Sequence, residues 1–574
     1  MGRIRQDHSG GEHSKTTIQH TRICKAVEST TEASGLHRAD CTFPGKIPYG
    51  MWKKQTRAGC GCSAIEKSIT GETPYPRSNA SFPFLRSVRT KDRIMLFQAI
   101  FAIIIVINIC FAISIVFLER RNPTAALAWL SILIFLPVVG FILYLILGQN
   151  YTREQLFTLK KKDDETLLDL ISEQKKMISA KTTSPEDVLL RPFKSMVLML
   201  LENNWAYLTT DNRVRIYIDG NDKFSALLTA IHGAKDHINL EYYIIRNDHL
   251  GGEIVAALAE RARAGITVRL LVDGLGCGKL PGDFFSDYVA AGGKLAKFFP
   301  SRIPFINLRM NFRNHRKIAV IDGTIGFVGG FNIGDEYLGK DPRFGYWRDT
   351  HLKIEGTAAH ALQIRFFLDW NFATGEYVGY DTRYYPTPST TGTTAIQIVS
   401  SGPDARWNQI KEAYLKLINT AKKSVYIQTP YFVPDESVMD ALRIAALSGV
   451  DVRIMIPNRP DHPFVYWTSY SYIGELLDAG VKAYTYENGF IHAKTVVVDG
   501  IAGSVGSANW DVRSFRLNFE TNAFVYDRHV CGELHEHFLR DIADSLELTP
   551  ERYAQRSRII KIKESVCRLF SPLL

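Results

Sequence analysis

Residues Asn314–Asn332 read NHRKIAVIDGTIGFVGGFN, and residues Ile491–Asn509 repeat the same skeleton as IHAKTVVVDGIAGSVGSAN. Both copies follow one pattern: H-x-K, four residues, D, six residues, then G, a G or S, any residue and N. The fixed positions are His315, Lys317, Asp322, Gly329, Gly330 and Asn332 in the first copy and His492, Lys494, Asp499, Gly506, Ser507 and Asn509 in the second. The return of so long a spacing indicates an internal duplication.

Segments typical of strands and helices alternate twice around these copies. One round runs from about Arg213 to the strand that carries His315, and the second runs from Gln409 to the strand that carries His492. Such alternation predicts an α/β fold with a largely parallel or mixed sheet flanked by helices in each lobe. The Pro/Thr/Gly-rich stretch Tyr385–Thr394 marks a boundary between lobes. We therefore expect lobe 1 over residues 211–385 and lobe 2 over residues 386–550, related by a pseudo-twofold axis.

Two uncharged stretches precede the lobes, Ile94–Leu118 with 25 residues and Ala125–Leu147 with 23. Each is long enough to cross a hydrocarbon core of about 30 Å as a helix, so residues 94–147 predict a transmembrane helical hairpin, with a kink at Pro137. Basic residues beyond its outer ends outnumber those in its turn, which predicts a multi-pass protein of the cytoplasmic membrane with both termini and the lobes on the cytoplasmic side. The outer residues are Arg86, Arg89, Lys91, Arg93, Arg153 and Lys160, Lys161 and Lys162, against Arg120 and Arg121 in the turn.

Three further segments flank these regions. Residues 1–93 are polar and without periodicity, which predicts a disordered tail or a start codon placed too far upstream. Residues 148–210 are charged with a helical period and predict a helical connector. Residues 551–574 mix aliphatic and basic residues, which fits an amphipathic helix that lies on anionic lipid or packs on its own lobe.

Composition narrows the partners only partly. The 574-residue chain has a formal net charge of +10, which suits nucleic acid, an anionic membrane or a phosphate substrate. Its eight cysteines form no disulfide framework, which fits a reducing compartment. Cys60 and Cys62 could suggest a zinc site, but no second pair has structural-zinc spacing, so we interpret them as incidental.

The repeated motif has the residues that a phosphodiester reaction needs. On a strand, H-x-K points an imidazole and an ammonium to the same side. Gly330 and its counterpart Ser507 follow glycines that let the backbone approach a ligand, while Asn332 and Asn509 supply amides. Asp322 and Asp499 complete the candidate catalytic set, although their place at strand ends favours pairing with a cation or bonding to backbone over contact with substrate.

Two lobes together bring two histidines, two lysines and two asparagines to one interface. Lysines and amides can stabilise the charge that develops on phosphorus oxygens without a metal. One imidazole can attack phosphorus while the other protonates the leaving alkoxide and later deprotonates the incoming alcohol. Metal ligation is disfavoured, because lysine is not a ligand and no carboxylate cluster accompanies the histidines.

Each catalytic histidine needs a partner that fixes its tautomer. The candidates are Asp349, which follows the first motif, and Glu520, which follows the second. Each is expected on a strand of the same lobe as its histidine.

Both motifs resemble the HKD signature of the phospholipase D superfamily, and the resemblance covers roughly residues 211–545. Within that superfamily the chain is similar to bacterial cardiolipin synthases. The stretches that carry this second resemblance are Arg121–Thr124, Leu136–Gly140, Gly330–Tyr337, Thr429–Asp435 and Ser571–Leu574. The long tail before residue 80 departs from that family.

This resemblance implies transfer of a phosphatidyl group from one phosphatidylglycerol to another, with cardiolipin and glycerol as products. It also implies a phosphohistidine intermediate, no metal and no cofactor. His315 is then the nucleophile and His492 the acid and base. Gly330, where the family more usually has Ser, leaves lobe 1 one hydroxyl donor short.

Other activities use the same residues. A hydrolytic phospholipase D would differ only in taking water as acceptor. A nuclease of the same superfamily would also be basic, but it has no need of a membrane hairpin, so we expect no nucleic-acid partner.

Overall fold

The computed structural model describes residues 90–117, 123–145, 171–176, 178, 190–300, 311–379, 381–389, 392–569 and 571. The tail 1–89, Cys60 and Cys62, and most of the connector 148–210 lie outside the described residues. Of the connector, helix α8 (Lys194–Asn204) packs on lobe 2, where Met196, Val197, Leu200 and Leu201 are buried.

Lobe 1 is an α/β unit whose sheet is mixed, as the sequence predicts. Asp219 and Asp248 cap its first two long helices by accepting hydrogen bonds from backbone N–H groups at their starts. Its strands are β1 (Thr209–Tyr217), β2 (His237–Tyr242), β3 (Thr267–Asp273), β4 (Lys294–Phe298), β6 (Lys317–Ile321), β7 (Ile325–Gly329) and β9 (His351–Glu355). Its helices are α9 (Gly220–His232), α10 (His249–Arg263), α11 (Ser286–Ala290) and α12 (Ala358–Thr374).

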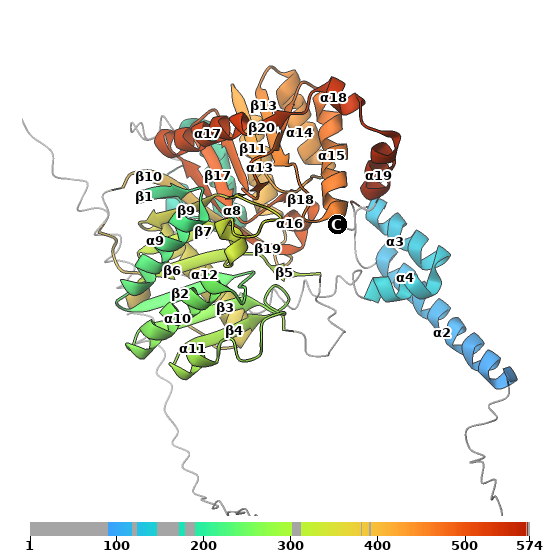
Figure 1. Ribbon diagram of the computed structural model, residues 1–574, viewed down its shortest axis with the longest axis horizontal. Helices are drawn as coiled ribbons and strands as arrows, with labels where there is room; N and C mark the ends of the chain where they lie inside the picture. Colours follow the sequence, from blue (N-terminus) through green and yellow to red (C-terminus); the bar gives the residue numbers. More distant parts are fainter. Residues whose placement is uncertain are drawn as a thin grey trace, which may run out of the picture. The chain divides into compact units, whose positions relative to one another are not determined.

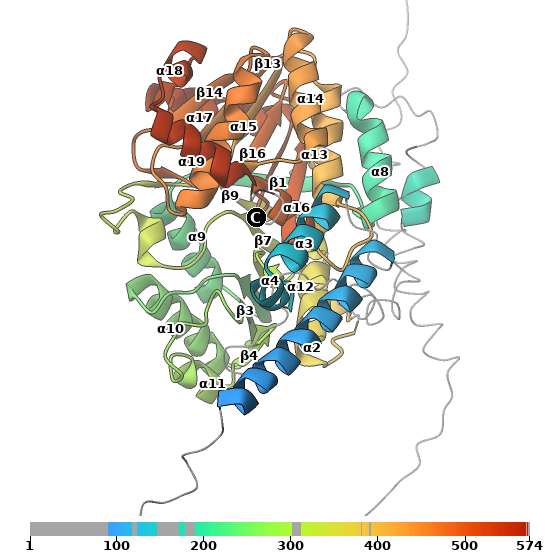
Figure 2. The ribbon, with the colours of Figure 1, turned by 90° about the vertical axis from the view of Figure 1, so that its right-hand side faces the viewer.

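Lobe 2 repeats this plan, with Asp435 and Asp527 as the capping residues. Its strands are β10 (Thr394–Ser401), β11 (Ser424–Gln428), β13 (Asp451–Pro457), β14 (Lys482–Tyr486), β16 (Thr495–Val498), β17 (Ala502–Gly506), β19 (Asn518–Tyr526) and β20 (Ser545–Glu547). Its helices are α13 (Gln409–Thr420), α14 (Glu436–Leu447), α15 (Pro463–Leu477), α16 (Val512–Arg516), α17 (Arg528–Ala543), α18 (Pro550–Ala554) and α19 (Arg558–Leu569). Figure 2 shows α13, α14 and α15 in front of the lobe 2 strands.

The strand order shows the duplication directly. Lobe 1 runs β1-β9-β7-β6-β2-β3-β4, and lobe 2 runs β10-β19-β17-β16-β11-β13-β14. In both lobes the last three strands are parallel, while the motif strands β6 and β16 join them in antiparallel register. The two half-sheets form one continuous sheet, because β1 pairs with β10 and β10 pairs with β19 (Figure 1). The motif strands therefore occupy equivalent places on the two sides of that junction.

Three of the hydrophobic cores place the two lobes and their junction. One lies under α9 and α10 in lobe 1, and another lies under α13 and α14 in lobe 2. A third crosses the junction and joins residues of both motif strands, such as Val320 and Val497, to Leu362 on α12 and Leu534 on α17. Burial on both sides explains why β6 is apolar after Lys317 and β16 is apolar after Thr495.

The apolar region before the lobes begins with α2 (Thr90–Phe117), whose stretch Met95–Phe117 is the one helix in the described part of the chain long and apolar enough to cross a membrane. The second apolar stretch differs from the single kinked helix that its sequence predicts. It forms two short helices, α3 (Pro123–Phe135) and α4 (Pro137–Leu143), with a sharp turn at Leu136. Gly140, in α4 just after this turn, has no room for a side chain, since a Cβ there would lie 2.6 Å from the Ile132 carbonyl oxygen.

Candidate active site

The two motif histidines are each held by the backbone of the opposite lobe. His315 follows the short strand β5 (Arg313–Asn314), which pairs in parallel with β19 of lobe 2. His492 follows β15 (Phe490–Ile491), which pairs in parallel with β8 (Trp347–Arg348) of lobe 1. The His315 amide donates to the Phe519 carbonyl over 2.9 Å, and the His492 amide donates to the Arg348 carbonyl over 2.7 Å. This reciprocal exchange of short strands brings both motifs to one interface.

The carboxylate partners are also exchanged between lobes. The Nδ1 of His315 lies 3.0 Å from both carboxylate oxygens of Glu520, and the Nδ1 of His492 lies 2.6 Å from Oδ2 of Asp349. The two predicted residues are therefore the histidine partners, but the expectation that each serves its own lobe is wrong. The exchange follows from the strand pairing, because Glu520 comes just after Phe519 and Asp349 just after Arg348.

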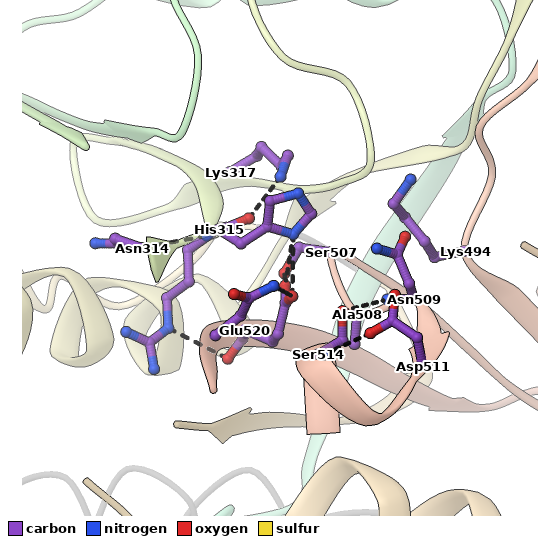
Figure 3. A network of polar contacts seen from close by, with 12 residues as sticks. Asn314, His315, Lys317, Lys494, Ser507, Ala508, Asn509, Asp511, Ser514 and Glu520 are labelled. Atoms are coloured by element: carbon purple, nitrogen blue, oxygen red, sulfur yellow. Dashed lines mark hydrogen bonds and ion pairs between the residues drawn. The ribbon is translucent and has the colours of Figure 1, made fainter. Parts of the chain in front are cut away.

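The two lysines complete the shared cluster. Lys317 Nζ donates to the His315 carbonyl over 2.6 Å, and Lys494 Nζ donates in the same way to the His492 carbonyl. Figure 3 shows Lys317 and Lys494 on either side of the His315 ring, with Asn509 on the Lys494 side. Both lysines are fully buried, so their ammonium groups have few water contacts to lose when an anion enters.

Burial sets the charge of the histidines. Desolvation is the largest influence on both, and it lowers the pKa of His315 to about 4 and that of His492 to about 4, although Glu520 and Asp349 act in the opposite direction. Both rings are therefore neutral near pH 7. The acceptor carboxylate on Nδ1 places the proton of each neutral ring on that atom, which leaves the lone pair of Nε2 free. Such a ring is ready to attack phosphorus or to receive a proton.

The lysines are shifted in the same direction. Desolvation by burial lowers the pKa of Lys317 to about 7 and that of Lys494 to about 8, against the raising influence of Glu520 and Asp349. Burial by itself would raise the pKa of the Glu520 carboxyl, but His315, Lys317 and Ser507 outweigh it and hold the pKa below its usual value. An anion between the lysines would raise the pKa of both lysines and of both histidines.

Gly330 and Ser507 occupy equivalent positions with different neighbours. Ser507 Oγ donates to Oε2 of Glu520 over 2.5 Å. At Gly330 a Cβ would lie 2.0 Å from Oδ1 of Asp349, so a serine would have to displace that carboxylate. Oδ1 of Asp349 instead accepts the backbone N–H of Thr350 over 2.7 Å. The missing hydroxyl of lobe 1 is thus replaced by a backbone donor, and the glycine makes room for the aspartate.

The two asparagines differ in their contacts. Asn332 is satisfied inside lobe 1, where its Oδ1 accepts from the Ile244 amide over 3.3 Å and its Nδ2 donates to the Tyr337 hydroxyl over 3.2 Å. Asn509 Oδ1 is buried without a hydrogen-bond partner among the described residues. Asn509 is therefore the more available of the two for a ligand.

Asp322 and Asp499 lie outside this cluster. The Asp322 carboxylate accepts the backbone N–H groups of residues 235, 236 and 237, and the Asp499 carboxylate accepts those of residues 422, 423 and 424. Both aspartates have positive φ, 50° and 54°. They fix the starts of β2 and β11 to the turn after the motif strand, which is the bonding to backbone that their place at the strand ends favours. A direct catalytic role for either aspartate stays a prediction.

Two buried arginines that the sequence analysis missed hold the backbone of the residues that carry the exchanged carboxylates. Arg316, the middle residue of the first H-x-K, donates to the Glu520 carbonyl over 3.2 Å and to Thr521 Oγ1 over 2.9 Å. Arg348 forms an ion pair of 2.8 Å with Asp541 of lobe 2 and donates to the Asp349 carbonyl. The sequence offers one indication of their role, which is that each arginine lies next to a predicted site residue.

Two lobes that each provide an H-x-K motif to one shared site define a protein of the phospholipase D superfamily. The chain matches the family described as "Cardiolipin synthase, PLD-like domain" over residues 227–342 and 414–542, and the family described as "Phospholipase_D-nuclease N-terminal" over residues 99–149. The cardiolipin synthase of Staphylococcus aureus (strain Mu50 / ATCC 700699) is 51% identical over 491 residues, which is 85% of this chain and 99% of that protein.

A second relative supports this assignment, and one solved structure shares the fold. The cardiolipin synthase of Listeria innocua serovar 6a is 50% identical over 473 residues, 82% of this chain and 98% of that protein. The crystal structure of phosphatidylserine synthase from Haemophilus influenzae Rd KW20 has a TM-score of 0.51 at 15% identity, covering 67% of this chain and 97% of that one, and it shows the fold alone. The chain belongs to the cardiolipin synthase family, and it is accordingly a transferase enzyme.

Proposed function

We propose that this enzyme transfers a phosphatidyl group from one phosphatidylglycerol to the terminal hydroxyl of another, forming cardiolipin and releasing glycerol. The observation that carries the proposal is the pair of neutral histidines, each bonded through Nδ1 to a carboxylate of the other lobe, beside two buried lysines. The phosphodiester monoanion of the lipid is an anionic partner for these two lysines. The lysines also stabilise the additional negative charge that builds up on the phosphate oxygens as phosphorus is attacked.

In the first step of this mechanism, Nε2 of His315 forms a bond to phosphorus, and the bond between phosphorus and the glycerol oxygen breaks. His492, protonated when the anionic lipid raises its pKa, donates its proton to the departing oxygen, so free glycerol leaves. The product is a phosphatidyl group held on His315. Asn509, Asn332, Ser507 and Gly330 form or support the phosphate-binding surface, with Asn509 in direct contact.

In the second step, Nε2 of His492 accepts the proton of the incoming glycerol hydroxyl. The resulting oxygen attacks phosphorus and the bond to His315 breaks, which regenerates both histidines. Glu520 stabilises the positive charge on His315 and Asp349 that on His492. The near-symmetry of the site also permits the opposite order, with His492 attacking.

An assay with radiolabelled phosphatidylglycerol and the purified full chain tests the reaction. We expect labelled cardiolipin and free glycerol in equal amounts, with no requirement for an added metal or cofactor. Phosphatidic acid as the main product would contradict the transferase and favour hydrolysis by water. The His315→Ala and His492→Ala variants serve as matched controls and should form almost no product.

We further propose that residues 94–147 hold the enzyme in the cytoplasmic membrane with both outer ends on the cytoplasmic side. The length and apolar character of α2 and the basic residues outside the apolar region support this placement. A fluorescent-protein fusion at the C-terminus should fluoresce, and an alkaline phosphatase fusion at the same point should be inactive. The reverse pattern would contradict the sidedness.

A further inference from the structure

The C-terminal helix α19 turns its apolar residues away from the protein. Ile559, Ile562, Val566 and Leu569 are 66%, 62%, 45% and 78% exposed. Their spacing of three, four and three residues places them on one face of the helix. A helix that packs on a globular core normally turns its apolar face inward, whereas α19 turns its apolar face to the outside.

The opposite face of α19 is attached to lobe 2 by a buried acidic residue. Glu564 is buried, and its Oε1 accepts from Nε of Arg556 over 2.8 Å. Its Oε2 accepts from the Tyr553 hydroxyl over 3.4 Å. Cys567, one turn further on, is also buried. These contacts fix the rotation of the helix.

Contacts with α15 fix the helix from both flanks (Figures 1 and 2). Arg568 forms an ion pair with Glu475 and lies over the ring of Tyr472 at 4.6 Å from its centroid. Lys563 lies over the Trp467 ring at 5.3 Å. Because both edges are held, the outward direction of the apolar face is a property of the folded lobe.

The exposed face is bordered by positive charge. The helix has the four basic residues Arg558, Lys561, Lys563 and Arg568 against the single acidic residue Glu564, which Arg556 already neutralises. Within the part of the chain that the structure describes, Arg558, Lys561 and Lys563 have no carboxylate partner. An apolar stripe between basic flanks is the pattern of helices that lie in the interface of an anionic bilayer.

We propose that α19 is a membrane-contact element that seats lobe 2 on an anionic bilayer, with Ile559, Ile562, Val566 and Leu569 inserted among the lipid headgroups. Charge decides between this partner and a second copy of the chain. Two α19 faces brought together would oppose like charges, whereas an anionic surface attracts the basic residues on both edges of the helix. The inference rests on the proposed function only in that the substrate is itself an anionic membrane lipid.

Photocrosslinking identifies what covers this face. The photoreactive residue p-benzoylphenylalanine replaces Ile562 in the full chain, which is reconstituted into vesicles of phosphatidylcholine and radiolabelled phosphatidylglycerol. We expect a labelled lipid adduct, and much less of it when the same residue replaces Ile444, a similarly exposed isoleucine on α14. A crosslink between two protein chains, or equal lipid labelling at both positions, would overturn the proposal.

An activity measurement tests the consequence. The Ile562→Glu/Leu569→Glu double variant should lose roughly tenfold in activity on phosphatidylglycerol vesicles, because two side chains can no longer enter the interface. Its activity on dispersed short-chain phosphatidylglycerol should equal that of the wild type. The Ile444→Glu/Leu447→Glu variant changes two exposed apolar residues of α14 and should retain vesicle activity.

The outcomes separate the two proposals. Unchanged vesicle activity of the α19 variant, or an equal loss on dispersed lipid, would contradict a membrane-contact role. A wild-type protein that makes no cardiolipin from either substrate would contradict the proposed function, while the lipid adduct at residue 562 would still report on α19.

Discussion

His315 and Glu520 are 205 residues apart in the sequence, yet Nδ1 of His315 lies 3.0 Å from both carboxylate oxygens of Glu520. The reciprocal contact joins His492 to Asp349, 143 residues away. Each lobe thus contributes one histidine and orients the histidine of the other. Neither lobe alone contains a complete histidine–carboxylate pair, so the site is complete only when both lobes are present.

The exchanged pairs predict different effects for two isosteric variants. Glu520→Gln removes the charge that orients His315 and should lower turnover roughly 10²–10⁴-fold. The loss of turnover in Glu520→Gln should be seen both with phosphatidylglycerol and with a lipid ester whose leaving group departs without protonation. Asp349→Asn affects the proton donor His492. It should therefore slow the reaction of phosphatidylglycerol far more than the formation of the intermediate from the ester whose leaving group needs no proton. Equal effects of both variants on both substrates would contradict the assignment.

The lowered lysine pKa values predict an alkaline loss of activity. A lysine is charged below its pKa, and burial lowers the pKa of Lys317 to about 7 and that of Lys494 to about 8. The value of kcat/KM should therefore fall as the pH rises from 7 to 9, as first Lys317 and then Lys494 lose their charge. In Lys317→Arg, whose side chain stays charged over this range, the fall of kcat/KM at the lower pH should disappear and only the fall due to Lys494 should remain. An alkaline limb that stays in place in this variant would exclude Lys317 as its origin.

Asp322 and Asp499 should act on stability and not on chemistry. Each carboxylate accepts three backbone N–H groups, so Asp322→Asn or Asp499→Asn should lower the free energy of unfolding by about 1–3 kcal/mol. Denaturant titration of the purified variants measures this loss. Turnover per folded molecule should stay close to that of the wild type, and a drop of several orders of magnitude would return these aspartates to the catalytic set.

Gly330→Ser should be more harmful than Ser507→Gly. The new Cβ would meet Oδ1 of Asp349 at 2.0 Å and displace the carboxylate that orients His492. A shift of about 1 Å in a catalytic group can reduce the rate about 100-fold. Ser507→Gly removes the hydrogen bond to Glu520 and the acceptor of the Thr521 N–H, but it brings no atom into contact with either carboxylate. Steady-state rates of the two variants give the order, and a fully active Gly330→Ser would show that Asp349 has room to move.

Much of this architecture is predictable from the repeat. The spacing around His315 and His492 predicts two α/β lobes and one shared site, because equivalent motif positions must lie on equivalent strands. It also selects Asp349 and Glu520 as histidine partners. The exchange between lobes is not predictable, since it depends on β5 and β15, strands of two residues whose pairing has no periodicity of its own.

Two other features needed three-dimensional contacts. The turn at Leu136 involves the close approach of Gly140 to Ile132, whereas the sequence predicts only a kink at Pro137 within one apolar helix. The helical period of residues 558–569 predicts an amphipathic helix but leaves open which face packs on the lobe. The buried contact of Glu564 with Arg556 settles that choice and leaves the apolar face outward.

The most direct test of the two-histidine mechanism is peptide mass spectrometry of a trapped intermediate. The His492→Ala variant is incubated with a phosphatidyl ester of p-nitrophenol, whose leaving group needs no proton, and the reaction is quenched in alkali. The mechanism predicts a phosphatidyl group on His315 that persists, because no base remains to activate the acceptor. The same adduct on any other residue, or its formation in His315→Ala, would contradict the mechanism.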